Sequence, residues 1–398
     1  MGTDRPAIEG GQPIREQPLP YGRHRISDDD VHAVEQVLRS DWLTTGPTIE
    51  AFEGTLRAVT GAAGVVAVSS GTAALHAACA TLGLAPGDEV IVPSLTFVAS
   101  ANAILYVGGR PVFAEVRPDT FTIDPDDVER RLTSRTRAIM TVHYAGLATD
   151  LGRLRALTAS RGLVLVEDAA HALGASTEEG PVGARSDLAT FSFHPVKHVT
   201  TGEGGAIATT SAERAAAMRR FRNHGLSSDV REREGQGDWA YDLVDFGFNY
   251  RLSDIGAALG RSQLGSLPQS LARRRALARA YRSAFADVPE LELQSVQHVD
   301  AHAWHLFVVA IKSERLRVGR DQLVRALRAE GIVANVHYAP AHLMRYYREH
   351  LGTAAGMLPV TEDVASRLIT LPLFPAMSDH DLADVVTALR RCVDWYRA

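Results

Sequence analysis

The sequence predicts an α/β fold with a large domain, whose mostly parallel sheet is sandwiched by helices, and a smaller C-terminal α+β domain. In the first half of the chain, short apolar runs alternate with helical segments, the order expected of a parallel sheet with helices on both faces. From about residue 262 a long helix rich in arginine and alanine follows. We therefore predict a large domain over residues 1–261, including an extended arm over 1–25, and a small domain over 262–398.

Composition and charge narrow the classes of function. The chain has 398 residues, 45% hydrophobic and 22% charged, with a net charge of −5, which is globular and lacks the basic character of nucleic-acid binding. Cys79 and Cys392 fit no metal-binding spacing. No apolar run approaches the ~20 residues that cross a bilayer, and the N-terminus does not resemble a signal peptide. We expect a cytoplasmic protein that binds neither nucleic acid nor membrane.

The first helix is predicted behind Ser27, which can cap an acidic first turn at residues 28–30. A buried strand over 65–68 then leads into a helix that ends near Gly83. That helix begins with Ser70-Gly71-Thr72, whose backbone N–H groups, hydroxyls and positive dipole end suit an anion such as a phosphate. Taken alone, this segment is better explained as an ordinary helix cap, because serine and threonine are common caps.

Further strands are predicted within residues 89–109, 110–116, 137–144 and 162–170. Ligands of such sheets bind at the carboxyl ends of the strands, and Asp168 lies at one of these ends. A helix cap is the alternative role for a single aspartate in this position. In the small domain we predict strands over 307–312 and 332–338, and helices over 321–331 and 379–398.

Lys197 is one of only two lysines in the chain, although there are 42 basic residues. It lies between two runs of strand character, Ala189–Phe193 and Ala206–Thr209, in a segment that ends in Gly-Glu-Gly-Gly. This pattern predicts a β-ribbon that holds the lysine on a rigid base. A primary amine can condense with an aldehyde cofactor, whereas an arginine cannot. The alternative is a solvated loop lysine.

Four segments together resemble one enzyme family. They are SSGTAAL (69–75), EDAAHALGA (167–175), SFHPVKHVTTGEGG (192–205) and FNYRLSDIGAALG (248–260). Their sequence and order are similar to those of the DegT-type (DegT/StrS) sugar aminotransferases, which are pyridoxal phosphate enzymes of fold type I. The similarity runs from about Tyr21 to about Arg390. It implies an aspartate-aminotransferase-like fold and pyridoxal 5'-phosphate as the cofactor.

The resemblance also implies roles for single residues. Lys197 would be the covalent anchor of the cofactor and the general base, and Asp168 would keep the cofactor's ring nitrogen protonated. Phe97 would stack on the ring. His171 stands near the cofactor's phenolic oxygen, where many relatives have glutamine. The phosphate would be held by Gly71, Thr72, Ser192 and, from the facing subunit, Asn249, which implies a homodimer with shared active sites.

For the substrates, the resemblance implies transfer of an amino group from an amino acid, L-glutamate, to a keto sugar. The segment HYAPAHLMRYY (337–347) most resembles family members that act on 4-keto-6-deoxy sugars linked to UDP. Candidates to bind this acceptor are Arg251, His337, Tyr338, His342, Arg345 and Tyr346, since arginine suits bidentate contacts with a diphosphate.

Other functions remain as alternatives. The acceptor could be a cyclitol ketone or a 3-keto sugar. A pyridoxal phosphate-dependent sugar dehydratase would have histidine in place of Lys197, and a regulator without catalysis is not excluded by motif. A nicotinamide-dependent epimerase would need a Tyr-x-x-x-Lys pair, but Phe193 and Val308 stand four residues before the two lysines. His302 and His305 lack a carboxylate or cysteine to complete a metal site, so we predict no metal.

Overall fold

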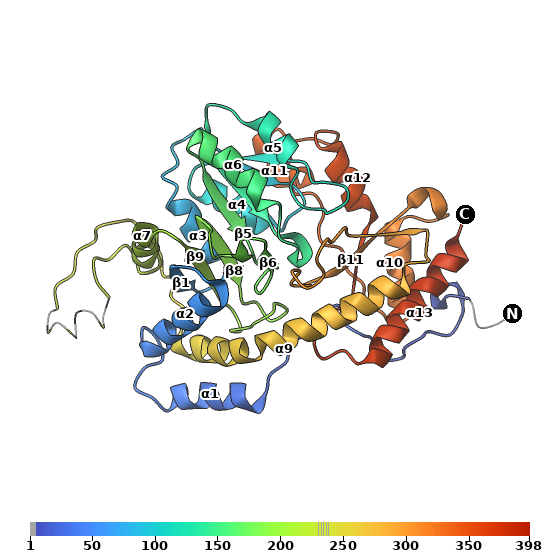
Figure 1. Cartoon of the computed structure of the whole chain (residues 1–398), viewed down its shortest axis with the longest axis horizontal. Helices are drawn as coiled ribbons and strands as arrows, with labels where there is room; N and C mark the ends of the chain where they lie inside the picture. Colours follow the sequence, from blue (N-terminus) through green and yellow to red (C-terminus); the bar gives the residue numbers. More distant parts are fainter. Residues whose placement is uncertain (1–4, 230, 232, 234, 236, 238) are drawn as a thin grey trace.

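The computed structural model (Figure 1) describes residues 5–229, 231, 233, 235, 237 and 239–398. Its centre is a seven-stranded sheet with strand order β1-β9-β8-β5-β4-β2-β3. Strand β9 is antiparallel to both of its neighbours, and all other pairs of adjacent strands are parallel. The fold class predicted from the sequence is therefore confirmed.

The strands are β1 (Gly64–Val68), β2 (Glu89–Pro93), β3 (Arg110–Ala114), β4 (Thr136–Val142), β5 (Val164–Asp168), β6 (Ser176–Thr177), β7 (Gly180–Pro181), β8 (Leu188–Ser192), β9 (Gly205–Thr209), β10 (Leu291–Leu293), β11 (Phe307–Ile311) and β12 (Leu368–Leu371). The helices are α1 (Asp28–Leu38), α2 (Pro47–Thr60), α3 (Gly71–Ala80), α4 (Val98–Tyr106), α5 (Pro125–Arg131), α6 (Leu151–Arg161), α7 (Ala212–Arg222), α9 (Asp254–Ala284), α10 (Arg320–Ala329), α11 (Arg345–Leu351), α12 (Pro359–Arg367) and α13 (Asp379–Tyr396). Short 3-10 turns cover Ala7–Glu9, Tyr144–Gly146, Ser313–Arg315 and Ala341–Leu343. None of the described helices is both long and apolar enough to cross a membrane.

Helices cover both faces of the central sheet because alternate residues of a strand point to opposite faces. In β1, Val66 and Val68 pack in a core with α3, α4 and α7, whereas Val65 and Ala67 pack with α2 and α9. Ile91 of β2 lies in a third core, formed with α5 and α6 on the same side as α2 and α9. The sheet is thus buried on both faces, and its strands are accordingly almost continuously apolar.

Helix α1 begins as predicted behind Ser27. The Ser27 hydroxyl accepts the Asp30 N–H at 3.3 Å, and the Asp30 carboxylate accepts the Ser27 N–H at 2.8 Å. This reciprocal pair is a capping box, which satisfies two backbone donors at the helix start. In Figure 1, α1 lies alongside the first half of the long helix α9.

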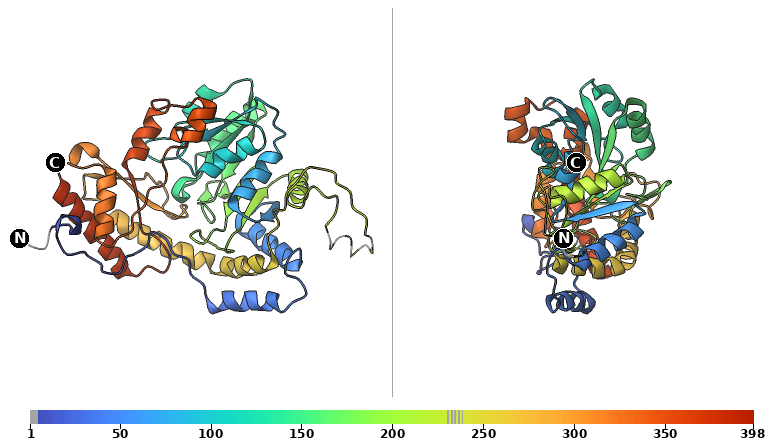
Figure 2. Two further views of the ribbon diagram at one scale, coloured as in Figure 1. Left: turned by 180° about the vertical axis from the view of Figure 1, so that it is seen from behind. Right: turned by 90° about the vertical axis from the view of Figure 1, so that its left-hand side faces the viewer.

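Helix α9 connects the sheet to the C-terminal part of the chain, as Figures 1 and 2 show. It begins at Asp254, earlier than the change of pattern at residue 262, because the hydroxyl of the N-cap Ser253 accepts the Gly256 N–H at 3.1 Å. The Asp254 carboxylate accepts the backbone N–H groups of Gly46 and Thr48 at 2.7 and 2.9 Å and so ties the start of α2 to α9. Further along, buried Arg274 donates to the carbonyl oxygens of Trp304, His305 and Leu373. One guanidinium therefore fixes two loops to the helix.

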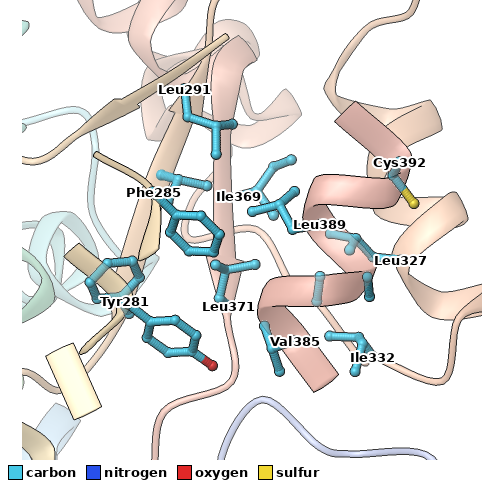
Figure 3. Packing of buried hydrophobic residues seen from close by; sticks show 14 of the residues in the cluster. Tyr281, Phe285, Leu291, Leu327, Ile332, Ile369, Leu371, Val385, Leu389 and Cys392 are labelled. Atoms are coloured by element: carbon cyan, nitrogen blue, oxygen red, sulfur yellow. The ribbon is translucent and has the colours of Figure 1, made fainter. Parts of the chain in front are cut away.

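The C-terminal part has its own sheet, with strand order β10-β11-β12 and antiparallel pairing. Its apolar core (Figure 3) brings together the end of α9, the strand β12 and the helices α10 and α13. Labelled members of this core are Tyr281, Phe285, Leu327, Ile369, Leu371, Val385 and Leu389. The predicted strand over 307–312 and the two predicted helices are confirmed.

The predicted strand over 332–338 is wrong. This segment makes only isolated bridges, from Ile332 to Leu19 and from Asn335 to Thr370. The N-terminal arm occupies one side of it, since the Val333 N–H donates to the Leu19 carbonyl at 2.9 Å. The arm itself is held against this C-terminal part, where buried Glu330 accepts the N–H groups of Ala7 and Ile14.

The carbonyl bonds of Arg274 lead to a stability prediction. We expect Arg274→Met to lower the free energy of unfolding by roughly 2–4 kcal/mol, because buried acceptors lose a charged donor. The measurement is thermal and urea unfolding of the full chain. Arg279→Met is the matched control on the same helix, since its ion pair with Asp300 is exposed on both sides and should change stability by less than about 1 kcal/mol. Equal stability of the Arg274 variant and the unmodified protein would contradict the prediction.

Candidate active site

Polar side chains gather where β5 and β8 end. Asp168, the last residue of β5, is 6% exposed. Its Oδ1 accepts the Ala170 N–H at 3.1 Å, and its Oδ2 accepts the Ser100 hydroxyl at 2.7 Å. The Ser100 hydroxyl in turn lies 2.7 Å from that of Thr96. The carboxylate is therefore held in one orientation by hydrogen bonds from α4 and from its own loop.

Lys197 lies in the loop between β8 and β9. These strands pair antiparallel with Ser192 opposite Gly205, which confirms the predicted β-ribbon. The Lys197 N–H donates to the His194 carbonyl at 2.9 Å. Burial lowers the pKa of Lys197 to about 8, and the negative charge of Asp168 opposes this shift. Near neutral pH the amine is therefore present in both its charged and its nucleophilic form.

Four histidines, each 5–8% exposed, surround this lysine: His171, His198, His305 and His337. Burial is the main cause that lowers the pKa of each, and the charge of Lys197 lowers it further. The rings are thus uncharged at neutral pH. Nε2 of His171 lies 3.1 Å from the Tyr338 hydroxyl, whose pKa is raised by burial. Both of these side chains can therefore exchange hydrogen bonds without carrying charge.

The start of α3 lies against the end of β8. A Cβ at Gly71 would be 2.8 Å from the Ser192 Cβ, so only glycine allows this close approach. Ser70 caps the helix by accepting the Ala73 N–H at 3.0 Å. The first-turn N–H groups of a helix have no partner within it and form its positive end. Together with the hydroxyls of Thr72 and Ser192, this glycine-lined helix start fits a phosphate.

Phe97 stands at the N-cap of α4 and is 56% exposed. Its ring centroid lies 6.0 Å from that of Tyr338, which belongs to the group around Lys197. An exposed aromatic ring near a partly buried amine and a buried carboxylate is suited to cover a planar ligand.

Asn249 and Arg251 lie in the segment that leads into α9. Asn249 is exposed, and the neighbouring Tyr250 carbonyl accepts the Ser69 N–H at 2.8 Å, beside the start of α3. Arg251 donates to the Asn223 side chain at 2.8 Å. It lines a surface pocket of about 650 Å³ that five further arginines also line: Arg57, Arg219, Arg220, Arg222 and Arg231.

The expected acceptor-binding residues are placed in different surroundings. His337 and Tyr338 belong to the group around Lys197, with ring centroids 5.0 Å apart, and burial lowers the pKa of His337 to about 4. His342 is fully buried, and its ring nitrogens lie 2.6 Å from the Ser94 hydroxyl and 3.0 Å from the Glu362 carboxylate. Arg345 and Tyr346 are exposed on α11.

The sequence did not predict a role for Ser100, and it suggested for His305 only a possible role as a metal ligand. Ser100 contacts Asp168 across 68 residues of sequence, and its only local signal is a hydroxyl within an apolar helix. His305 attracted notice as a possible metal ligand, yet it lies 3.4 Å from the Lys197 amine. Among the described residues, no group of three or more His, Cys, Asp or Glu side chains is arranged to hold a metal ion.

The chain is similar in sequence and structure to known aminotransferases. Residues 24–390 match the model of the DegT/DnrJ/EryC1/StrS aminotransferase family. The chain is similar to Helicobacter pylori PseC, an aminotransferase involved in the biosynthesis of pseudoaminic acid, with 29% identity, TM-score 0.89, and coverage of 96% of this chain and 100% of that one. The pyridoxal phosphate form of Spr1654, a putative sugar aminotransferase from Streptococcus pneumoniae, has 30% identity, TM-score 0.88, and coverage of 95% and 99%. DesI, solved in the presence of its TDP-sugar product, has 33% identity, TM-score 0.87, and coverage of 97% and 96%.

The pKa of Lys197 gives a pH prediction. In the cofactor-free protein, acylation of this amine should rise with pH around a midpoint near 8, because only the neutral amine is a nucleophile. Peptide mass spectrometry after brief exposure to an acylating reagent measures it, and Lys312 serves as an internal standard for reagent strength. A midpoint above about 10, the ordinary range of lysine, would contradict the prediction.

Proposed function

Because the chain belongs to the DegT/DnrJ/EryC1/StrS aminotransferase family and is a pyridoxal phosphate-dependent sugar aminotransferase, we propose that it aminates a nucleotide-linked 4-keto-6-deoxy sugar. The amino group would come from an amino acid, L-glutamate. The observation that carries this proposal is the partly buried Lys197 amine, whose pKa is lowered by burial to about 8 against the opposing effect of the Asp168 charge. An amine in this state can bind an aldehyde cofactor and can also move protons.

The residues around Lys197 fit pyridoxal phosphate. The Gly71 and Thr72 end of α3, with Ser192 against it, would hold the phosphate. Asp168 would pair with the ring nitrogen, and Phe97 would cover the ring. The buried Nδ1 of His171 has no hydrogen-bond partner within the described part of the chain, so this ring nitrogen is available to an oxygen of the cofactor.

Each of these residues has a chemical task. When bound, pyridoxal phosphate supplies an electron sink that stabilises negative charge on the carbon that loses a proton. Lys197 takes that proton on Nζ and returns it to carbon, so it serves as the general base and acid. The Asp168 carboxylate is held by Ser100. Its negative charge would keep the facing ring nitrogen of the cofactor protonated and positively charged. Neutral His171 and Tyr338 orient polar groups without adding charge to the site.

A nucleotide-linked acceptor is supported by charge and by similarity. Six arginines and three carboxylates line the pocket that contains Arg251, and arginine binds diphosphate oxygens in pairs. DesI was solved with a TDP-sugar product. The segment 337–347 resembles members that use UDP-linked 4-keto-6-deoxy sugars. His337 and Tyr338, beside the lysine, are the side chains proposed to contact the sugar.

The proposal includes a homodimer in which Asn249 completes the phosphate site of the facing subunit. The described residues between α7 and α9 project from the body of the chain in Figures 1 and 2. Large apolar side chains along it are 50–85% exposed: Trp239, Tyr241, Leu243, Val244 and Phe246. A cluster of this kind is typical of a surface that another chain covers.

The first test replaces the proposed base. Lys197→Ala should reduce transamination by at least about 10⁴-fold, because both covalent attachment and proton transfer are lost. The assay is amino-sugar formation with L-glutamate and a UDP-linked 4-keto-6-deoxy sugar. Lys312→Ala replaces the only other lysine and should leave the rate unchanged. Substantial turnover by the Lys197 variant would reject the assigned site.

The second test asks which subunit Asn249 serves. Asn249→Ala should weaken cofactor affinity about tenfold or more, because a hydrogen bond to a charged phosphate is lost. Subunits carrying Lys197→Ala and subunits carrying Asn249→Ala are then mixed and assayed at limiting cofactor. If Asn249 acts across the interface, mixed dimers contain one intact site, and activity rises above the average of the separate variants.

In a matched control, subunits that carry both Lys197→Ala and Asn249→Ala are mixed with Asn249→Ala subunits. No mixed dimer then contains an intact site, so activity should not rise on mixing. No recovery in the first mixture would show that Asn249 acts within its own subunit or not at all.

A further inference from the structure

His305 is a buried group in direct contact with Lys197 that the chemistry above does not use. Its Nε2 lies 3.4 Å from the lysine Nζ, and the residue is 5% exposed. Its Nδ1 has no hydrogen-bond partner among the described residues. Among the described residues, the contact of Nε2 with the Lys197 amine is therefore the hydrogen bond available to the His305 ring.

Several elements fix the position of His305. The preceding residue, Trp304, has φ 49°, a left-handed conformation that is strained for a bulky side chain. Gly146 approaches so closely that a Cβ there would lie 2.9 Å from the Trp304 N and 3.1 Å from the His305 N. Arg274 holds the carbonyls of both residues from α9. Backbone strain kept in place by three separate contacts points to a functional position.

The charges around the ring keep it neutral. Burial lowers the pKa of His305 well below its ordinary value, and the positive charges of Lys197 and Arg274 and the rings of His171 and His198 lower it further. The charge of Asp168 raises the pKa of Lys197 and so favours the charged form of the amine. A neutral imidazole has one nitrogen that accepts a hydrogen bond. Nε2 of His305 faces the Lys197 amine, which donates when it is charged.

We propose that His305 is a positioning residue for Lys197, whose amine donates a hydrogen bond to the uncharged ring whenever the amine is free of the cofactor. This inference rests on the proposed function, in which Lys197 must take a proton from one carbon and return it to another. A lysine side chain has four rotatable bonds, and a fixed acceptor restricts the positions of its amine. The same bond stabilises the charged form of the amine.

The small number of lysines makes a direct test possible. In full-length protein with ¹³C,¹⁵N-labelled lysine, two side-chain signals are expected, and Lys312→Arg assigns them. The Lys197 signal is titrated with pyridoxamine 5'-phosphate bound, which leaves the amine free, and again after removal of the cofactor. His305→Leu should lower the pKa of Lys197 by about one unit, because a hydrogen bond to the charged amine is lost.

Two variants separate this role from simple packing. His305→Gln keeps an acceptor and should restore at least half of the lost pKa shift. His198→Leu removes another buried ring, whose Nε2 faces the Ala303 carbonyl at 2.9 Å and not Lys197, and should leave the pKa of Lys197 within about 0.3 units of the unmodified protein. If His305→Leu does not fold, His305→Met replaces it in the comparison.

The inference is overturned if the pKa of Lys197 is the same with and without the His305 ring. Identical shifts in His305→Leu and His305→Gln would overturn it as well, since the ring would then act by packing alone. These outcomes leave the proposed function untouched, because that function fails only if Lys197→Ala retains transamination. The two failures are therefore distinguishable.

Discussion

A primary amine and a carboxylate share a site that is largely shielded from water, and the arrangement of the surrounding chain depends on this pair. Burial alone would drive Lys197 to its neutral form, and the charge of Asp168 opposes this, so that the pKa settles at about 8. An acid–base group works best when its pKa is near the working pH. The side chains around the pair are uncharged histidines and hydroxyls, which form hydrogen bonds without adding a further charge to the site.

Both parts of the chain contribute to the balance. The large sheet contributes to the site the ends of β5 and β8 and the β8–β9 ribbon that carries Lys197. Helix α3, which packs on this sheet, contributes its positive N-terminal end. The C-terminal part supplies His305, His337 and Tyr338. Arg274 of α9 ties the loop that carries His305 to the long helix that passes between the two parts. The geometry of the site is thus coupled to the way the C-terminal part packs against the loops at the end of the large sheet, where Leu306 and Val308 share a core with Leu95, Tyr144 and Ala145.

Features with local causes could be predicted from the sequence, and features set by distant partners could not. The Ser27 cap depends on residues three positions apart, and the ribbon around Lys197 pairs two strands joined by a single loop. Both are confirmed. The predicted strand over 332–338 is wrong because the segment divides its hydrogen bonds between two distant partners, Leu19 of the N-terminal arm and Thr370 of β12. The bond from Ser100 to Asp168 and the contact of His305 with Lys197 join segments 68 and 108 residues apart. No local pattern records such pairings.

The most direct test of the central claim is the absorbance spectrum of the cofactor-loaded protein, followed first with L-glutamate and then with single ketones. The visible band of the bound cofactor should disappear when L-glutamate is added, and it should return, with release of an amino sugar, when a UDP-linked 4-keto-6-deoxy sugar is supplied. A band that no amino acid changes would contradict transamination at Lys197. A band that returns only with a 3-keto sugar or a cyclitol ketone would contradict the proposed acceptor.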